Sequence, residues 1–212
     1  MRFHDYAKFL SSPEARAVVG PVAAIIIEDE VEIDTTIRHH AFQGFKTILA
    51  FAPRELDLPE AVANMVTRID FATRAPSATE AILDPLMRAL PKGTWLFYCY
   101  NAEFLFYPFA ETRSVGEMLA FHTEERRRAM LTYVVDVYAG DLNDAPNAVS
   151  LEDAHLDRSG YYALGRYDEA GNAADRQLEF YGGLRWRFEE HIEEPRRRID
   201  RIALVRTNPN VS

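Results

Sequence analysis

Asn101 and Glu103 are the first side chains with strong oxygen donors after a long apolar stretch. They follow Thr94–Tyr100, in which nearly every residue is β-branched, aromatic or aliphatic. A run of this kind predicts a strand buried on both faces in the middle of a parallel sheet. Ligands of open α/β sheets bind at the carboxyl ends of such strands. We therefore expect Asn101 and Glu103 to lie in a site.

A second group of oxygen donors follows the apolar segment Val22–Ile27. Glu28, Asp29, Glu30 and Glu32 place four acids within five positions. One interpretation is a solvated helix start, in which acids offset the positive end of the helix dipole. The other is a ligand site at the end of a strand.

Cationic side chains that could bind an anion occur late in the chain. Arg185 and Arg187 follow Gly182-Gly183, and His191 comes shortly after them. Guanidinium groups donate bidentate hydrogen bonds to phosphates, so these arginines could hold a diphosphate, and His191 could be a further donor or an ordinary polar residue. Alternatively, both arginines pair on the surface with neighbouring acids. Those acids are Glu189, Glu190, Glu193 and Glu194.

The segments that would position these residues alternate between strand and helix patterns. The strand Val22–Ile27, a helix over Glu32–Phe42 ended by Gly44, and the strand Lys46–Phe51 form a βαβ unit, which implies parallel strands and a right-handed crossover. Further helices are predicted at 5–10, 58–66, 78–90 and 114–128, and further strands at 66–71, 131–139 and 202–205. Pro85 is expected to kink or shorten its helix. The polar stretch 140–174 is predicted to be irregular and functional, or a lid.

Length and composition predict one α/β domain over residues 1–212. The chain is 48% hydrophobic, which is enough for a substantial core. Its net charge of -9 argues against a nucleic-acid partner. The lone Cys99 excludes an internal disulfide and is predicted to be a packed core thiol. No apolar run has the length of a transmembrane helix, and no signal peptide is evident, so we expect a soluble cytoplasmic protein.

Several common mechanisms lack their sequence motifs. The chain contains no G-x-G-x-x-G, P-loop, H-E-x-x-H or G-x-S-x-G pattern. His39 and His40 are adjacent, so on a helix their side chains point about 100° apart and are poorly placed to chelate one metal. We predict that one of them is a buried or half-buried histidine held by hydrogen bonds.

Five segments between residues 22 and 206 together resemble glycosyltransferases of family 2 and the related family 92. They are Ile27-Glu28-Asp29-Glu30, His40 with Gly44-Phe45, Glu103-Phe104-Leu105, Tyr181–Arg187 and Arg201–Arg206. In order and spacing they are similar to the K-N-E, H-x-x-x-G-F, D-x-D-E-F, G-G-x-R-x-R and K-x-P-L-x-R segments of that family. The resemblance covers most of the chain.

The resemblance implies a GT-A fold, a Rossmann-like, mixed and mostly parallel sheet flanked by helices that binds a nucleotide sugar at its carboxyl edge. It implies donor binding by Glu28, Asp29, Glu30, Arg185 and Arg187, and the nearby His191 is a further candidate for donor binding. Members of the family use the D-x-D carboxylates to hold Mn²⁺ or Mg²⁺ on the donor diphosphate, and inverting members use an Asp or Glu as base. By this comparison Glu103 is the candidate metal ligand, and Glu103 with Asn101 are the candidate catalytic residues.

The chain departs from the family pattern at three places. Tyr100 and Ala102 stand where the two aspartates belong, and residues 52–55 lack the acidic D-x-S-x-D pattern. The family continues into acceptor-side helices at the point where this sequence ends, at Ser212. Arginines could partly replace a missing metal at the diphosphate.

Three hypotheses follow. The first is a glycosyltransferase that moves a sugar from a nucleotide-sugar donor to an unknown acceptor, and it predicts that the site residues converge on one cleft. The second is a binding or regulatory module with the GT-A fold that has lost catalysis. The third is an unrelated α/β domain whose acidic strand ends are merely solvated.

Overall fold

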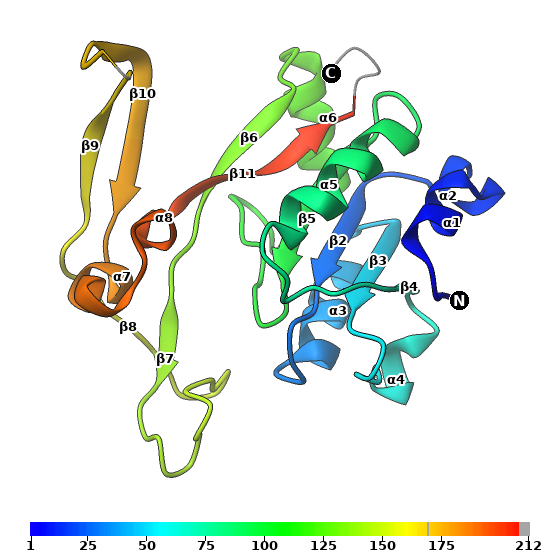
Figure 1. Cartoon of the computed structure of the whole chain (residues 1–212), viewed down its shortest axis with the longest axis horizontal. Helices are drawn as coiled ribbons and strands as arrows, with labels where there is room; N and C mark the ends of the chain where they lie inside the picture. Colours follow the sequence, from blue (N-terminus) through cyan, green and yellow to red (C-terminus); the bar gives the residue numbers. More distant parts are fainter. Residues whose placement is uncertain (169, 208–212) are drawn as a thin grey trace. The chain divides into compact units, whose positions relative to one another are not determined.

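Seven strands form one sheet, in the order β1-β4-β3-β2-β5-β11-β6 (Figure 1). The structure is a computed structural model that describes residues 1–168 and 170–207. The strands are β1 (Arg2–Phe3), β2 (Val22–Ile26), β3 (Thr47–Ala52), β4 (Thr67–Asp70), β5 (Trp95–Tyr100), β6 (Ala129–Tyr133) and β11 (Asp200–Arg206). The pairs β1–β4, β4–β3, β3–β2 and β2–β5 are parallel, whereas β11 runs antiparallel to β5. The α/β class and the mostly parallel, Rossmann-like sheet are thereby confirmed.

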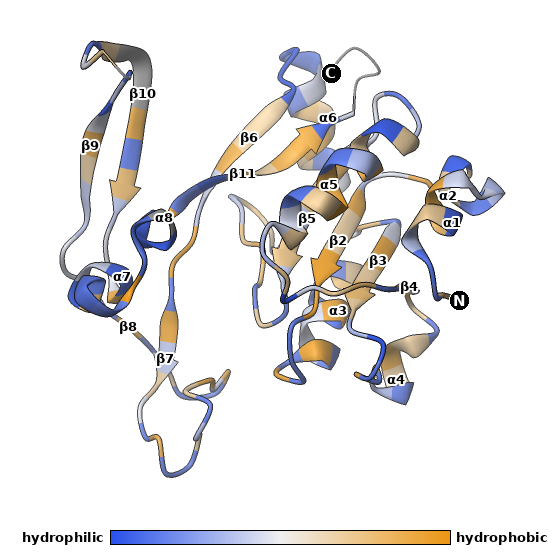
Figure 2. Cartoon of the chain, viewed as in Figure 1, coloured by the Kyte–Doolittle hydropathy of each residue, from blue (hydrophilic) through white to orange (hydrophobic). Residues whose placement is uncertain are grey.

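The central strands are apolar because both of their faces are covered. Every residue of β2 is buried, and alternate residues point to opposite faces. Ala23 and Ile25 belong to one core cluster, and Ala24 and Ile26 belong to the other. Figure 2 shows the resulting band of apolar residues along β2, β3 and β5. The expectation for β5 was partly wrong, because its second neighbour is antiparallel.

Helices cover both faces of the sheet. The cluster that contains Ile25 also takes in residues of α3 (Ile33–Phe42), α4 (Glu60–Ala63) and α6 (Val115–Glu124). The cluster that contains Ile26 takes in residues of α1 (Tyr6–Ser11), α2 (Pro13–Arg16) and α5 (Ala78–Ala89). None of the described helices combines the length and apolar character that crossing a bilayer requires.

Most of the predicted helices are confirmed, with small shifts at their ends. α6 starts with the expected capping box, in which Ser114 and Glu117 satisfy each other's backbone N–H groups. α5 continues through Pro85 to Ala89, so the proline does not shorten it. The side chains of Ile82 and Leu86 are fully buried and hold this helix on the sheet.

The chain changes direction across the sheet between β2 and β5. From β2 it proceeds to β3 and β4 on one side, and then α5 returns it to β5 on the other side of β2. This reversal is a topological switch point, where the loops after two adjacent parallel strands part and leave room for a ligand. The residues after β2 and β5 are therefore the best placed to contact a ligand.

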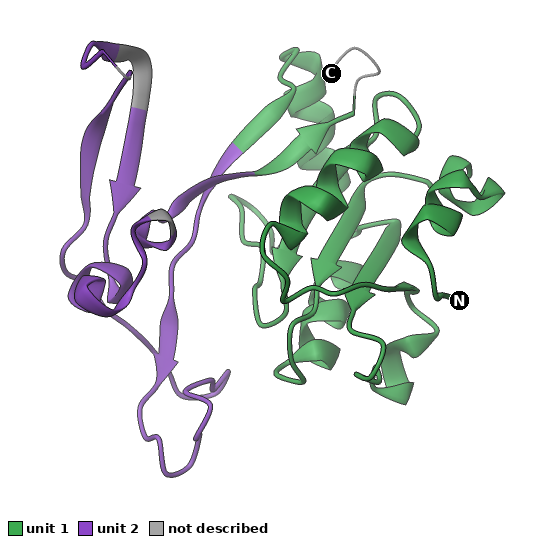
Figure 3. Ribbon diagram, viewed as in Figure 1, with its two compact units in different colours: residues 1–130, 203–212 green, residues 131–202 purple. Residues whose placement is uncertain are grey.

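The chain divides into two compact units (Figure 3). Unit 1 comprises Met1–Met130 with Ala203–Ser212, and unit 2 comprises Leu131–Ile202. Unit 2 contains the antiparallel pairs β7 (Val137–Ala139) with β8 (Ala154–Leu156) and β9 (Tyr162–Tyr167) with β10 (Ala173–Tyr181). It also contains α7 (Leu184–Arg187), the 3-10 turn η1 (Glu189–His191) and α8 (Glu194–Arg197). The single domain predicted over residues 1–212 stays a prediction.

Two predictions for unit 2 were wrong in detail. The strand expected over 131–139 is interrupted after Tyr133, because the chain there presents Asp136 to Arg185 at 2.6 Å. The stretch 140–174 is not wholly irregular, since β8, β9 and the start of β10 lie within it. Its Gly, Asn and Asp residues gather in the turns between these strands, which concealed the strand signal.

Candidate active site at the β2 and β5 strand ends

Asn101 joins the ends of β2 and β5. Its Oδ1 accepts a hydrogen bond from the Glu28 backbone N–H at 2.9 Å. Its Nδ2 donates to Asp29 Oδ1 at 2.6 Å and to the Val31 carbonyl oxygen at 2.9 Å. One amide side chain thus fixes the whole acidic loop that follows β2. The structure brings together three of the residues predicted to form the site: Asn101, Glu28 and Asp29.

Two further loops close around the same strand ends. The Thr73 hydroxyl donates to the Ile27 carbonyl oxygen at 2.7 Å, and Arg74 Nε donates to the Glu28 carbonyl oxygen at 2.5 Å. On the other side the Thr36 hydroxyl accepts from the Ala102 N–H at 2.9 Å. The loops after β2, β4 and β5 and the first turns of α3 therefore form one connected edge.

Glu103 turns back onto the strand that precedes it. Its Oε2 accepts a hydrogen bond from the Tyr100 backbone N–H at 2.9 Å. Tyr100 in turn shares a hydrogen bond of 2.6 Å with the Thr79 hydroxyl in the first turn of α5. Glu103 therefore caps the end of β5 and lies at the predicted edge of the sheet.

Backbone strain gathers at this edge. Ala102, Glu32 and Ser77 all have left-handed backbone angles, with φ of 59°, 52° and 56°. Each precedes or follows an element of the site: Ala102 follows β5, Glu32 precedes α3 and Ser77 precedes α5. A left-handed non-glycine residue costs on the order of 1–3 kcal/mol and persists only where surrounding contacts impose it. Such residues are typical of ligand sites.

The first turn of α5 adds donors to this edge. Ser77 occupies the N-cap position but makes no side-chain cap. The Ala78 N–H donates to the Ala75 carbonyl oxygen at 3.1 Å, and the next N–H groups of the first turn keep their partial positive charge. Arg74 is exposed, and only its Nε is used by Glu28. A helix N-terminus without a side-chain cap and an exposed guanidinium each favour anions.

The residues at this edge do not fit a preformed divalent-metal site. Asn101 points its amide N–H groups, not an oxygen, at Asp29, and Glu103 Oε2 receives a backbone N–H. Among the described residues no group of three or more His, Cys, Asp or Glu side chains is arranged to hold a metal ion. No chemical step is therefore assigned to a metal here.

The predicted cationic donors belong to unit 2 and have their own partners there. Arg185 forms a bidentate pair with Asp136, at 2.6 and 3.0 Å, and also donates to the Arg198 carbonyl oxygen at 2.8 Å. Arg187 pairs with Asp157 and donates to the Ser159 hydroxyl at 3.1 Å. Neither arginine pairs with the glutamates at 189–194 among the described contacts, so that alternative was wrong about the partners.

The Arg187 hydrogen bond, helped by the Ser159 hydroxyl, holds the pKa of Asp157 well below its usual range. Asp157 is therefore charged at neutral pH and fixes Arg187 in place. His191 is exposed and lies 3.4 Å from Glu190. Arg185 and Arg187 thus organise the fold of unit 2, and their predicted role toward a donor stays a prediction.

Comparisons of the chain with protein-family models, with curated proteins and with solved structures found no match. The glycosyltransferase resemblance therefore rests on the segments quoted above.

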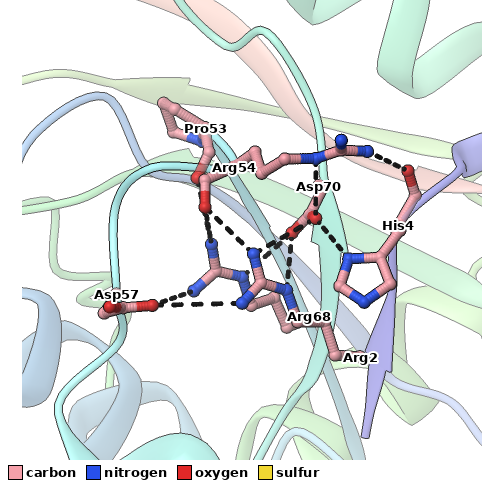
Figure 4. Close-up of polar contacts among 7 residues, drawn as sticks. All are labelled: Arg2, His4, Pro53, Arg54, Asp57, Arg68 and Asp70. Atoms are coloured by element: carbon pink, nitrogen blue, oxygen red, sulfur yellow. Dashed lines mark hydrogen bonds and ion pairs between the residues drawn. The ribbon is translucent and has the colours of Figure 1, made fainter.

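A second polar cluster lies beside β4 and was not predicted (Figure 4). Asp70 accepts hydrogen bonds from Arg2 at 3.0 and 3.2 Å, from His4 at 2.7 Å and from Arg68 at 3.2 Å. Arg54 Nε lies 3.6 Å from the same carboxylate. Burial alone would raise the pKa of Asp70, but the hydrogen bonds from Arg2, His4 and Arg68 outweigh burial and lower it to about 2.

The contacts of this cluster hold neighbouring strands and a loop together. Arg68 and Arg2 also donate to backbone carbonyl oxygens of residues 53 and 54, which ties β1 and β4 to the loop after β3. A shallow depression beside it is lined by Met1, Arg2, Asp57, Leu58, Glu60, Ala63 and Arg68. The guanidinium groups are already engaged by Asp70 and by carbonyl oxygens, so we assign the cluster to folding.

Sequence reasoning missed Thr36, Thr73 and Arg74 as parts of the site. Thr73 and Arg74 follow β4, and the rule that ligands bind beyond carboxyl ends of strands could have included them. Thr36 carried no such signal, because a threonine inside a helix pattern is unremarkable. Its hydroxyl is seen to matter only when Ala102 lies beside it.

Replacing Asn101 by alanine is expected to lower the free energy of unfolding by about 3 kcal/mol, because three hydrogen bonds lose their side-chain partner and each contributes on the order of 1 kcal/mol. Urea unfolding at neutral pH measures this. Asn143→Ala is the matched control, since Asn143 bonds only within its own exposed turn. Equal effects of the two substitutions would contradict the conclusion that the Asn101 side chain fixes the loop after β2.

Proposed function

We propose that the carboxyl edge at β2 and β5 binds a nucleotide-sugar donor and that the protein is a glycosyltransferase of the GT-A type. The observation that carries the proposal is the set of Asn101 hydrogen bonds at the switch point, which fix the Glu28–Val31 loop at the edge where α/β sheets bind ligands. The antiparallel β11 beside β5 also agrees with the mixed sheet that the resemblance implies.

The groups at this edge suit different parts of such a donor. The α5 N-terminus and Arg74 would attract the diphosphate, because both place donors and positive charge there. The carboxylates of Glu28 and Glu30 make no hydrogen bond to the described residues and remain for sugar or ribose hydroxyls. Asn101 acts as a positioning residue that keeps this loop in place.

Thermal unfolding with nucleoside diphosphates and nucleotide sugars, each with and without Mn²⁺, tests the proposal. A ligand at a hundredfold excess over its Kd stabilises the folded state by about 2.7 kcal/mol, which raises Tm by several degrees. We expect one nucleotide to give such a shift and Arg74→Glu to remove it. Arg88→Glu, which changes an exposed arginine in the last turn of α5, should leave the shift intact.

The outcome with Mn²⁺ separates two chemistries. A shift that grows with Mn²⁺ would mean that the bound diphosphate completes a metal site that the protein alone does not present. A shift that ignores Mn²⁺ would mean that N–H groups and arginine hold the diphosphate. A shift equal in wild type and Arg74→Glu, or absent with every nucleotide, would contradict donor binding at this edge.

A binding module without catalysis is the second candidate, and one observation favours it. Asn101 and Glu103 stand where the family has its metal and catalytic residues. Here Asn101 is hydrogen-bonded to the loop after β2, and Glu103 is hydrogen-bonded to the backbone of β5. Nucleotide binding without sugar transfer or donor hydrolysis would support the module. Turnover that is lost in Glu103→Gln, with nucleotide binding kept, would support the enzyme.

A further inference from the structure

One edge of a β-ribbon in unit 2 is available for pairing. Within the described residues β9 pairs with β10 alone, and all six residues of β9 are exposed. Figure 1 shows these two strands lying along each other as a ribbon. A two-stranded ribbon is marginally stable in water, and an exposed strand edge is a template for another strand. The outer edge of β9 can therefore pair with a further strand.

The sequence of β9 and the residue before it is self-complementary. It reads Tyr161-Tyr162-Ala163-Leu164-Gly165-Arg166-Tyr167. An antiparallel pairing of two such strands about a two-fold axis at Leu164 puts Leu164 opposite Leu164 of the second copy. It also puts Ala163 opposite Gly165, Tyr162 opposite Arg166 and Tyr161 opposite Tyr167.

Each of these pairs is favourable in kind. Small residues face small residues, two aromatic rings face each other, and a guanidinium faces an aromatic ring twice. The axis can move only by whole residues, because paired residues must point to the same face. At Gly165 it would put Leu164 opposite Arg166 and Ala163 opposite Tyr167, and at Ala163 it would put Leu164 opposite Tyr162 and Tyr161 opposite Gly165. Both alternatives pair large residues with small ones or an apolar residue with a charge. The sequence therefore favours one register, as an isologous contact requires.

Little in β9 opposes such pairing. Natural edge strands are often protected by proline, lysine or a bulge, and β9 contains neither proline nor lysine. Its one charge, Arg166, lies 3.5 Å from Glu179 on β10, so part of that charge is already balanced. The irregularity of the ribbon lies on β10, where the register shifts between Ala173 and Leu178. β9 is thus the regular edge.

We propose that two copies of this chain associate through β9, forming a four-stranded antiparallel sheet in the order β10-β9-β9-β10. The partner is a second copy because the strand is complementary to itself in one register. This inference is independent of the nucleotide site, since every residue that carries it lies in β9, in β10 or at Tyr161 just before β9.

Disulfide trapping tests both the association and its register. In the proposed pairing the two copies of residue 164 are about 5 Å apart, within the range that a disulfide spans, whereas the two copies of residue 161 are about 20 Å apart. Mild oxidation should therefore link Leu164→Cys into a covalent dimer and leave Tyr161→Cys monomeric. The natural Cys99 is fully buried and does not compete.

Sedimentation velocity over a broad micromolar range provides the second readout. The wild-type mass should rise from 24.2 kDa toward twice that value with concentration. Leu164→Lys should stay monomeric, because it opposes two like charges on the axis. Leu156→Lys should behave as wild type, since Leu156 is as exposed, at 46% against 50%, but lies on β8. A wild type that stays monomeric, equal cross-linking at 161 and 164, or a dimer that Leu164→Lys leaves intact would overturn the proposal.

Discussion

Replacing Asp70 by asparagine should lower the free energy of unfolding by about 3–5 kcal/mol, the usual cost of removing one partner from a buried ionic cluster. The Asp70 side chain is 4% exposed and is the common acceptor for Arg2, His4 and Arg68. Without its charge, Arg68, itself 7% exposed, keeps its positive charge next to Arg2 with no buried anion. The repulsion between the two arginines and the loss of their hydrogen bonds to Asp70 weaken the contacts that join β1 to β4.

Urea unfolding at neutral pH measures this effect, and Asp57→Asn is the matched control. Asp57 lies 3.8 and 3.9 Å from Arg68 and Arg2 but is 90% exposed, so its loss should cost no more than about 1 kcal/mol. Equal losses in the two variants would show that the cluster is not the support described here.

The same cluster predicts an acid dependence. The pKa of Asp70 is lowered to about 2, so the stability that its charge contributes is complete above the ordinary value near 3.8 and is lost as the pH falls toward 2. Stability measured from neutral to acidic pH should therefore fall less steeply in Asp70→Asn than in wild type. An identical acid limb in both proteins would contradict the assignment.

Acidification should also destabilise the protein through His40. His40 is fully buried on α3; its Nδ1–H donates to the Thr36 carbonyl oxygen at 2.8 Å, and its Nε2 lies 3.8 Å from Cys99 Sγ. Burial lowers its pKa to about 4, an effect that the Thr36 hydrogen bond opposes and the neighbouring His39 adds to. The histidine is therefore neutral in the folded protein.

The direction of the effect follows from the lowered pKa. Folding stability is complete above the unfolded value near 6.5 and falls as the pH drops toward 4, because the unfolded chain binds the proton more readily. The total is about 3.5 kcal/mol if each pKa unit contributes about 1.4 kcal/mol. Urea unfolding across this range should show the loss in wild type.

His40→Leu isolates the contribution of this residue. The variant loses the hydrogen bond to Thr36 at every pH, but its stability should fall less between pH 7 and pH 4 than that of wild type. His191→Leu is the control and should keep the wild-type pH profile, because His191 is exposed and its ion-pair neighbour is Glu190. Parallel pH profiles for wild type and His40→Leu would contradict a neutral core histidine.

Local sequence pattern was enough to predict the layered fold. Continuous apolar runs such as Val22–Ile27 predict buried parallel strands, and the helix pattern between two of them predicts a crossover. The prediction that one of the adjacent histidines is buried and hydrogen-bonded was confirmed by His40, and that of a packed thiol by Cys99. These features depend on burial, which periodicity along the chain records directly.

The partners of the polar groups were decided only by the tertiary structure. Asn101 was predicted at the site edge, but its partner Glu28 lies 73 positions away, and the Asp70 partner Arg2 lies 68 positions away. Arg185 and Arg187 are residues of a type that binds diphosphate, but in the structure they form ion pairs with Asp136 and Asp157. A sequence determines which segments are buried, because solvent exposure follows local periodicity. Which charge meets which depends on how the crossovers order the strands, and no local pattern contains that order.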